Sequence, residues 1–280
     1  MGRGRMMGGG NMLAGLQSPS SFADRVYGLL ERVQYRRMET AAELDAVLRL
    51  RYEAYLKEGA ILVSESGRLE DAFDEVDNVY NFGVFVDGEL ASALRLHRLS
   101  HLHQKSPGLE TFGEFLIPEL RACKLILDPN RFVANYRLAR LHPALPYVTA
   151  RLGVMACVHF GIDLMTMTVR AELQAFYKRT LFAYQACSPR PYPLLSKPIS
   201  LLFTDFVRDA DRIFRRRPYW ISSESERQAL FGKGPTSLRA QSGAVAIVPT
   251  YVAQAASRLV RVGLNRPKRA VASPRIAASR

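Results

Sequence analysis

Apolar residues first recur at helical spacing between residues 40 and 59. Thr40 and Glu43 form a capping box there, in which each side chain accepts a hydrogen bond from the backbone N–H of the other residue. The apolar positions that follow at intervals of three and four residues would line one buried face of a helix, and Gly59 is a typical residue to end it. A shorter helix is predicted over residues 22–32.

The next segment has the pattern of a β-hairpin. Residues 79–86 are mostly apolar or aromatic, which is typical of a buried strand. Asp87 and Gly88 suit a two-residue turn. Residues 89–97 then alternate their side chains between two faces, as a returning strand does. We therefore expect two paired antiparallel strands here.

A third buried strand is predicted over residues 123–127, after a long loop at residues 100–118. This strand runs into Asp128 and then Pro129, which has no N–H to donate and is expected to end the hydrogen-bond ladder. Asp128 and Arg131 should then lie where a strand opens out and leaves backbone N–H groups without partners.

Helices and strands alternate through the rest of the folded part. Helices are expected over residues 146–160, 171–183 and 223–231, and strands over residues 162–169 and 194–206. Together with the hairpin, this order predicts an α/β fold with a mixed central sheet and helices on both faces.

The positive charge of the chain lies near its ends. The formal net charge is +13, of which +2 comes from residues 1–19 and +9 from residues 233–280, where no acidic residue occurs. Residues 20–232 therefore carry only +2. Because a nucleic-acid-binding domain carries its basic residues on a folded face, we expect no specific nucleic-acid ligand.

Composition divides the chain into three parts. We expect a disordered N-terminal segment at residues 1–21, a folded domain at residues 22–232, and a basic, disordered C-terminal tail at residues 233–280. Such a tail attracts an anionic surface, for example a membrane, weakly and without specificity.

The cysteines and histidines predict neither a disulfide framework nor a metal site. Cys123, Cys157 and Cys187 are odd in number and widely spaced, which favours a reducing compartment. His101 and His103 have no cysteine or glutamate at ligand spacing, so we expect no metal and no bound cofactor. No apolar run approaches the roughly 20 residues of a membrane span. We expect a cytoplasmic protein.

Several short motifs, in a fixed order, resemble the GNAT superfamily of acyltransferases. The likeness is closer to the long-chain N-acyl amino acid synthases of the FeeM type, and more distant to the acyl-homoserine-lactone autoinducer synthases. The residues that carry it are 50–55 with 58–59, 73–78, 94–97, 128–133, 145–147, 169–177 and 190–193. The resemblance implies a GNAT-like acyltransferase fold.

The resemblance also implies an activity and its site. A fatty acyl group would move from a thioester on acyl carrier protein to the amino group of an amino acid. The residues expected to take part in catalysis are Asp74, Asp77, Asp128 and Glu172. Those expected to bind substrate are Arg95, Arg131, Phe132 and Tyr177. Where an acid is expected after the Arg-Phe-Val stretch, this chain has Asn135.

Acyl transfer to an amine explains why such residues are needed. The amine must lose a proton before it attacks, because a free amino group is mostly protonated near pH 7. A carboxylate can accept that proton. The tetrahedral intermediate needs hydrogen-bond donors for its oxyanion, which free backbone N–H groups beside Pro129 would supply. A guanidinium such as that of Arg95 or Arg131 would bind the carboxylate of an amino acid.

The donor is expected to be acyl-phosphopantetheine on acyl carrier protein. Residues 137–146 lack the glycine-rich turn whose amides hold the pyrophosphate of coenzyme A. Carrier proteins are acidic, so exposed basic residues would dock one by charge complementarity. The candidates for docking are Arg137, Arg140, Lys178, Arg179, Arg215 and Arg216.

Three other functions remain open from the sequence, and one of them is salt-sensitive binding of nucleic acid through the tail at residues 233–280. An acyl-homoserine-lactone synthase would also need S-adenosylmethionine, which no feature of the chain demands. A non-catalytic GNAT-like module would use its basic tail to bind a membrane or an acidic partner.

Overall fold

The computed structural model describes residues 21–192, 194–234 and 246–247 of the chain. The predictions about residues 1–20 and about most of the tail lie outside these ranges. The central sheet follows the order β6-β8-β5-β4-β3-β2-β1-β9, and β7 pairs with β8 outside this path. The strands are β1 (Val33–Arg37), β2 (Val79–Val86), β3 (Glu89–Leu99), β4 (Ile126–Ala134), β5 (Leu164–Val169), β6 (Tyr184–Gln185), β7 (Arg190–Tyr192), β8 (Leu195–Asp205) and β9 (Ala246–Ile247).

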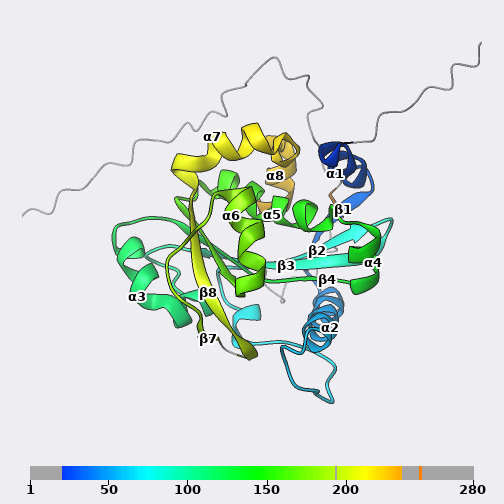
Figure 1. Cartoon of the computed structure of the whole chain (residues 1–280), viewed down its shortest axis with the longest axis horizontal. Helices are drawn as coiled ribbons and strands as arrows, with labels where there is room; N and C mark the ends of the chain where they lie inside the picture. Colours follow the sequence, from blue (N-terminus) through cyan, green and yellow to red (C-terminus); the bar gives the residue numbers. More distant parts are fainter. Residues whose placement is uncertain (1–20, 193, 235–245, 248–280) are drawn as a thin grey trace, which may run out of the picture.

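Helices cover both faces of this sheet (Figure 1). The α-helices are α1 (Phe22–Leu30), α2 (Ala41–Lys57), α3 (Pro107–Arg121), α4 (Tyr136–Leu141), α5 (Leu145–Phe160), α6 (Gln174–Leu181), α7 (Phe206–Arg216) and α8 (Glu224–Phe231). The 3₁₀ helices are η1 (Ala72–Asp74), η2 (Ala171–Leu173) and η3 (Pro218–Trp220). No described helix is long and apolar enough to cross a membrane. The α/β architecture with helices on both faces is the predicted one.

The alternation of side chains along the strands separates two faces of the core. Leu127 and Met165 pack in the large apolar cluster that includes α1, α5, α7 and α8. Their neighbours Ile126 and Leu164 point the other way and pack with α3. The apolar face of α2 packs on the same side as α3, against Val133 of β4. Any residue of β3, β4 or β5 can therefore be assigned to an α5 face or to an α2–α3 face.

Strands β4 and β5 separate soon after they meet. They are the one parallel pair among the described strands, and they pair only at Ile126 with Leu164 and at Leu127 with Met165. Beyond these pairs β4 follows β3 and β5 follows β8. The expected opening at Asp128 is thus confirmed, and it takes the form of a wedge between two strands that both continue.

Pro129 does not end the strand, contrary to the sequence prediction. It pairs with Leu96 of β3, and β4 continues to Ala134. Beyond Leu127 the β5 side of β4 has no partner strand, and proline is tolerated at such an edge because no ladder hydrogen bond is lost.

A β-bulge follows Pro129 in β4. Arg131 has φ +52°, and the register between β3 and β4 shifts between Ala93 and Arg95. A bulge interrupts the alternation of side chains. Asn130 and Arg131 therefore both face α2, whereas Phe132 packs against the core on the α5 face.

The long loop predicted over residues 100–118 is wrong, because α3 occupies most of it. Ser106 caps this helix and Pro107 lies in its first turn, where a missing N–H costs nothing. Gly113 and Pro118 inside the segment disfavour a helix, and Phe112 has non-helical backbone angles. Burial of Leu116 and Leu120 against the sheet outweighs these breaks.

Other local predictions hold to within a few residues. Thr40 and Glu43 form the capping box of α2, and Gly59 follows it with a positive φ. The helix predicted over residues 171–183 divides into η2 and α6. Strand β1 and helix α7 were not predicted.

A buried ion pair fastens α8 to the core. Arg151 of α5 and Glu226 of α8 both have fully buried side chains and are joined by two hydrogen bonds, one of 2.9 Å. Arg151 also donates to the backbone carbonyl groups of Tyr219 and Ile221. Removing one partner of such a pair leaves an uncompensated buried charge, which costs more than the pair contributes.

We therefore expect Glu226→Ala to lower the free energy of unfolding by about 3–5 kcal/mol. The matched control is Glu224→Ala in the exposed first turn of the same helix, which should change it by less than about 1 kcal/mol. Urea denaturation followed by circular dichroism measures both. Equal losses in the two variants would contradict the structural role of the ion pair.

Candidate active site

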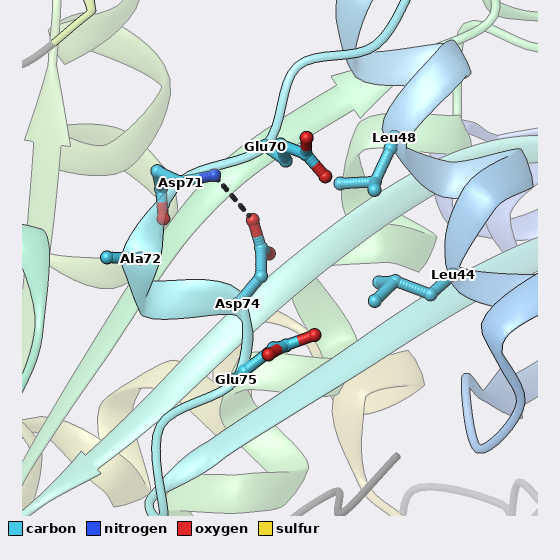
Figure 2. A pocket seen from close by; sticks show the side chains of 7 residues that line it. All are labelled: Leu44, Leu48, Glu70, Asp71, Ala72, Asp74 and Glu75. Atoms are coloured by element: carbon cyan, nitrogen blue, oxygen red, sulfur yellow. Dashed lines mark hydrogen bonds between the residues drawn. The ribbon is translucent and has the colours of Figure 1, made fainter.

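Five charged residues meet under α2, on the α2–α3 face of the sheet. Arg51 comes from α2, Arg95 from β3 and Arg131 from the bulge of β4, and all three are buried. Asp71 and Asp74 come from the segment that forms η1. Their side chains are held by a reciprocal cap, since the Asp71 N–H donates to Asp74 Oδ2 over 3.0 Å (Figure 2).

The carboxylates of this charged cluster each join two arginines. Asp71 binds Arg95 and Arg131 over 2.6 Å each. Asp74 binds Arg51 over 2.6 Å and Arg95 over 2.8 Å. Three guanidinium groups thus face two carboxylates, so the cluster carries one positive charge more than its own acids neutralise.

The same contacts set the pKa values of the two acids. Burial by itself would raise the pKa of Asp71, but hydrogen bonds and attraction from Arg95 and Arg131 outweigh it and lower that pKa. The pKa of Asp74 is likewise lowered, because Arg51 and Arg95 outweigh its burial. Both carboxyl groups are therefore ionised and form ion pairs with arginines, and both are weak bases.

Two guanidinium nitrogens of the cluster, Arg51 Nε and Arg131 Nη1, have no hydrogen-bond partner among the described residues. Arg131 gives Nε and Nη2 to Asp71, whereas its Nη1 is buried and makes no hydrogen bond with any described residue. The Arg131 Cζ lies 5.7 Å from the centre of the Tyr55 ring. An unsatisfied buried donor in a native fold calls for an explanation, and a ligand that accepts a hydrogen bond is one.

A run of hydrogen bonds between uncharged side chains leads away from Arg95 of the cluster. Arg95 Nε donates to Asn130 Oδ1 over 2.6 Å, and Asn130 Nδ2 donates to His97 Nδ1 and to the Asp128 carbonyl over 3.0 Å each. His97 Nε2 lies 3.0 Å from the carbonyl oxygen of Phe73, which can only accept, so Nε2 carries the proton.

His97, the histidine in this run of hydrogen bonds, stays uncharged. Burial and the nearby Arg95 lower the pKa of His97 to about 3. Because both ring nitrogens are occupied, His97 orients η1 and Asn130 and takes no part in proton transfer.

Asp128 lies at the vertex of the wedge, one residue beyond the last β4–β5 pair. It is fully buried, and its carboxyl group accepts hydrogen bonds from the Thr166 hydroxyl over 2.8 Å and from the Gly108 N–H over 3.1 Å. Burial raises the pKa of Asp128, against the lowering effect of Ser106, Thr166 and Gly108. Asp128 thus ties the start of α3 to β4 and β5.

Glycine is required at position 108 by this contact. A Cβ atom there would lie 2.5 Å from Asp128 Oδ2, which is closer than two such atoms can approach.

Three tyrosines gather around the wedge. Tyr55 of α2 interacts electrostatically with Tyr177 of α6 and with Arg131, and burial raises the pKa of Tyr177. Helices α2 and α6, which carry these two tyrosines, pack on opposite faces of the sheet. Tyr192 of β7 also interacts electrostatically with Arg131.

The remaining predicted acids lie outside the charged cluster. The side chain of Asp77 is 64% exposed and contacts His103 over 3.3 Å. The side chain of Glu172 is 59% exposed and lies 3.4 Å from Arg170. Phe132 faces the α5 side, as described above. The structure therefore brings Asp74, Arg95 and Arg131 together, with Asp128 close by, and their catalytic and binding roles stay predictions.

Arg51, Asp71 and Asn130 were missed as site residues. Arg51 follows Val47 by four residues, so it continues the apolar face of α2, and a charged residue on a buried face was the available signal. Asp71 precedes Asp74 by three residues, which is the spacing of a cap. Asn130 gave no signal, because only its pairing with Arg95 across β3 and β4 brings it to the cluster.

The predicted docking residues fall into two groups. Arg137 and Arg140 lie exposed on α4, and Arg137 pairs with Glu89. The other four lie exposed on the C-terminal parts of α6 and α7: Lys178, Arg179, Arg215 and Arg216. Helices α6 and α7 are joined there, since Arg212 and Arg216 stack over the ring of Phe182 at 3.7 and 5.6 Å.

A surface pocket of about 400 Å³ borders the charged cluster. Leu44 and Leu48 of α2 form its apolar side, and Glu70, Asp71 and Glu75 are among the acids opposite (Figure 2). Asp71 belongs both to this pocket and to the charged cluster. The acidic lining of the pocket attracts a positively charged group.

Comparisons with known proteins identify the family and the fold. The profile of the family described as N-acyl amino acid synthase FeeM matches residues 46–205, more than half of the chain. A search of curated proteins gives no significant match. Among solved structures, FeeM, an N-acyl amino acid synthase from uncultured soil microbes, is similar with a TM-score of 0.53 and 17% identity, over 68% of this chain and 93% of that one.

Two further solved structures match at lower scores. BjaI, a CoA-dependent acyl-homoserine lactone synthase, has a TM-score of 0.46 and 15% identity over 62% of this chain and 82% of its own. An acyl-CoA N-acyltransferase from Pseudomonas aeruginosa has a TM-score of 0.43 and 18% identity over 61% and 97%. By its family profile and its GNAT-like fold, the chain belongs to the FeeM family of N-acyl amino acid synthases and is an acyltransferase.

Proposed function

We propose that this enzyme transfers a long-chain fatty acyl group from acyl carrier protein to the α-amino group of an amino acid. The observation that carries the proposal is the unpartnered Nη1 of Arg131, buried next to an open wedge in the sheet. A carboxylate of the acceptor would satisfy this donor. It would also balance the extra positive charge of the cluster, because guanidinium and carboxylate form strong charge-assisted hydrogen bonds.

The wedge suits the thioester donor. From Asp128 to Ala134 the β5 side of β4 has no partner strand, so its backbone groups can pair with an extended chain. Phosphopantetheine is extended and contains amide groups, and it can add to such an edge as a peptide strand does. The thioester would then lie near the vertex, between Asp128 and Arg131.

The apolar cluster beneath α3 supports a long acyl chain. Phe112 and Leu116 of α3 pack with Phe203 of β8 beyond the vertex of the wedge. The acyl chain would extend into this cluster, where burial of each CH₂ group contributes about 0.8 kcal/mol.

Asp128 is the acid that we propose as general base. Asp74 is ionised but engaged by two arginines, and Asp77 and Glu172 lie exposed away from the wedge. Asp128 lies at the vertex, and its raised pKa makes it a stronger base than an ordinary aspartate. It would take the proton of the attacking ammonium group directly or through an ordered water.

A carrier protein suits the surroundings of the wedge better than coenzyme A. The chain passes from β4 directly into α4, and the Asn135 side chain caps that helix by accepting from the Leu138 N–H over 3.2 Å. The helix start therefore offers fewer free amides to a pyrophosphate. The basic residues of α6 and α7 offer a complementary surface to an acidic carrier protein.

Substitution of Arg131 tests the function. Arg131→Lys keeps a positive charge beside Asp71 but removes Nη1, so we expect the KM for the amino acid to rise about 10- to 100-fold, as for loss of a charged hydrogen bond. Mass spectrometry of products from purified enzyme, acyl carrier protein thioester and a mixture of amino acids identifies the acceptor first.

The control is Arg121→Lys at the exposed end of α3, which should leave the KM unchanged. If the wild-type enzyme acylates no amino acid in this assay, the proposed function is wrong. If it does so and Arg131→Lys keeps the same KM, Arg131 does not bind the acceptor.

The donor is tested separately by charge reversal on α7. We expect the double variant Arg215→Glu/Arg216→Glu to raise the KM for acyl carrier protein thioester at least about 10-fold, with a steep dependence on ionic strength in the wild type. The KM for the small thioester acyl-pantetheine should not change. Equal use of acyl-CoA and acyl carrier protein by the wild type would contradict a carrier-protein donor.

A further inference from the structure

The hydroxyl group of Tyr192 is another buried polar atom that can bind a ligand. Tyr192 belongs to the short strand β7 and is 7% exposed, and its Oη has no close hydrogen-bond partner among the described residues, although the Thr168 side chain is near enough to interact with it. A buried tyrosine hydroxyl usually finds a partner. Tyr35 in the core of this protein does so, since it donates to the Val148 carbonyl over 2.7 Å.

The hydroxyl group lies beside the wedge. It interacts electrostatically with Asp128 and Arg131 of β4 and with the side chain of Thr168, which belongs to β5 beyond its last pair with β4. The ring of Tyr192 stacks at a tilt on Phe112 of α3, with 6.4 Å between the ring centres. Strand β7 thus places the hydroxyl group of Tyr192, a hydrogen-bond donor, beside the wedge between β4 and β5.

We propose that Tyr192 is a catalytic residue that donates a hydrogen bond to the oxyanion of the tetrahedral intermediate. This inference rests on the proposed acyl transfer. The amine nitrogen forms a bond to the thioester carbon, and the carbonyl π electrons move to the oxygen, which becomes the oxyanion bound by Tyr192. When the carbonyl re-forms, the C–S bond breaks and the thiolate leaves. The proton lost by the amine goes to the general base, and Tyr192 keeps its own.

The surroundings of Tyr192 suit a donor better than a proton shuttle. Burial and the nearby Asp128 raise the pKa of Tyr192, against the lowering effect of Arg131 and Thr168. The phenol therefore remains protonated through the reaction. A donor that is fixed before the charge develops stabilises the transition state without reorganisation.

The test is Tyr192→Phe, which removes only the hydroxyl group. Loss of one oxyanion donor typically lowers kcat about 100-fold, and we expect this loss with KM values for donor and acceptor within two-fold of the wild type. The same loss is expected with hydroxylamine as acceptor, because the oxyanion forms whichever amine attacks. The free energy of unfolding should stay the same or rise slightly, since an unsatisfied buried hydroxyl is removed.

Tyr184→Phe is the matched control, because Tyr184 lies exposed on β6 outside the site. It should leave kcat and KM unchanged. An active wild type whose Tyr192→Phe variant keeps its kcat, or changes only its KM, overturns the role of Tyr192 and leaves the proposed function standing. A wild type that acylates no amine, hydroxylamine included, overturns both.

Discussion

The buried pairing of three arginines with two aspartates is the interaction on which this site depends. Buried charges are tolerated only where partners compensate them. Here the compensation joins α2, η1, β3 and the bulge of β4, which are distant in sequence. The positive φ of Arg131 is unfavourable for an arginine, and its two hydrogen bonds to Asp71 help to hold it. The same arrangement leaves Arg131 Nη1 available to a ligand.

The wedge between β4 and β5 opens the sheet next to the charged cluster. In a continuous sheet, β5 would pair with β4 at Asp128 and Arg131 and close this opening. The separation after Leu127 instead leaves one edge of β4 without a partner strand, and the bulge turns Asn130 and Arg131 to one face. Asp128 and the charged cluster lie beside this opening. The fold thus sets the position of the site, and the bulge in β4 sets which side chains face it.

The sequence predicted the elements that obey local rules and missed those decided by distant contacts. The capping box of α2 and the turn at Asp87 depend on neighbouring residues, and both were found. Helix α3 contains residues that break helices in isolation and forms because the sheet buries its apolar face. Of the charged cluster, Arg95, Arg131 and Asp74 were named from the resemblance, and their roles stay predictions. Asp71 was missed, because Asp77 has the same spacing from Asp74 on the other side and only the fold distinguishes them.

Comparison of an amino acid acceptor with its amide tests the central claim most directly. The two molecules differ only in the carboxylate that would bind Arg131 Nη1, so kcat/KM for acyl transfer isolates that contact. We predict that the purified wild-type enzyme prefers the amino acid by about 10- to 100-fold, as expected for a charged hydrogen bond in a buried site. Equal kcat/KM values would contradict the claim, because Arg131 Nη1 would then not recognise the acceptor.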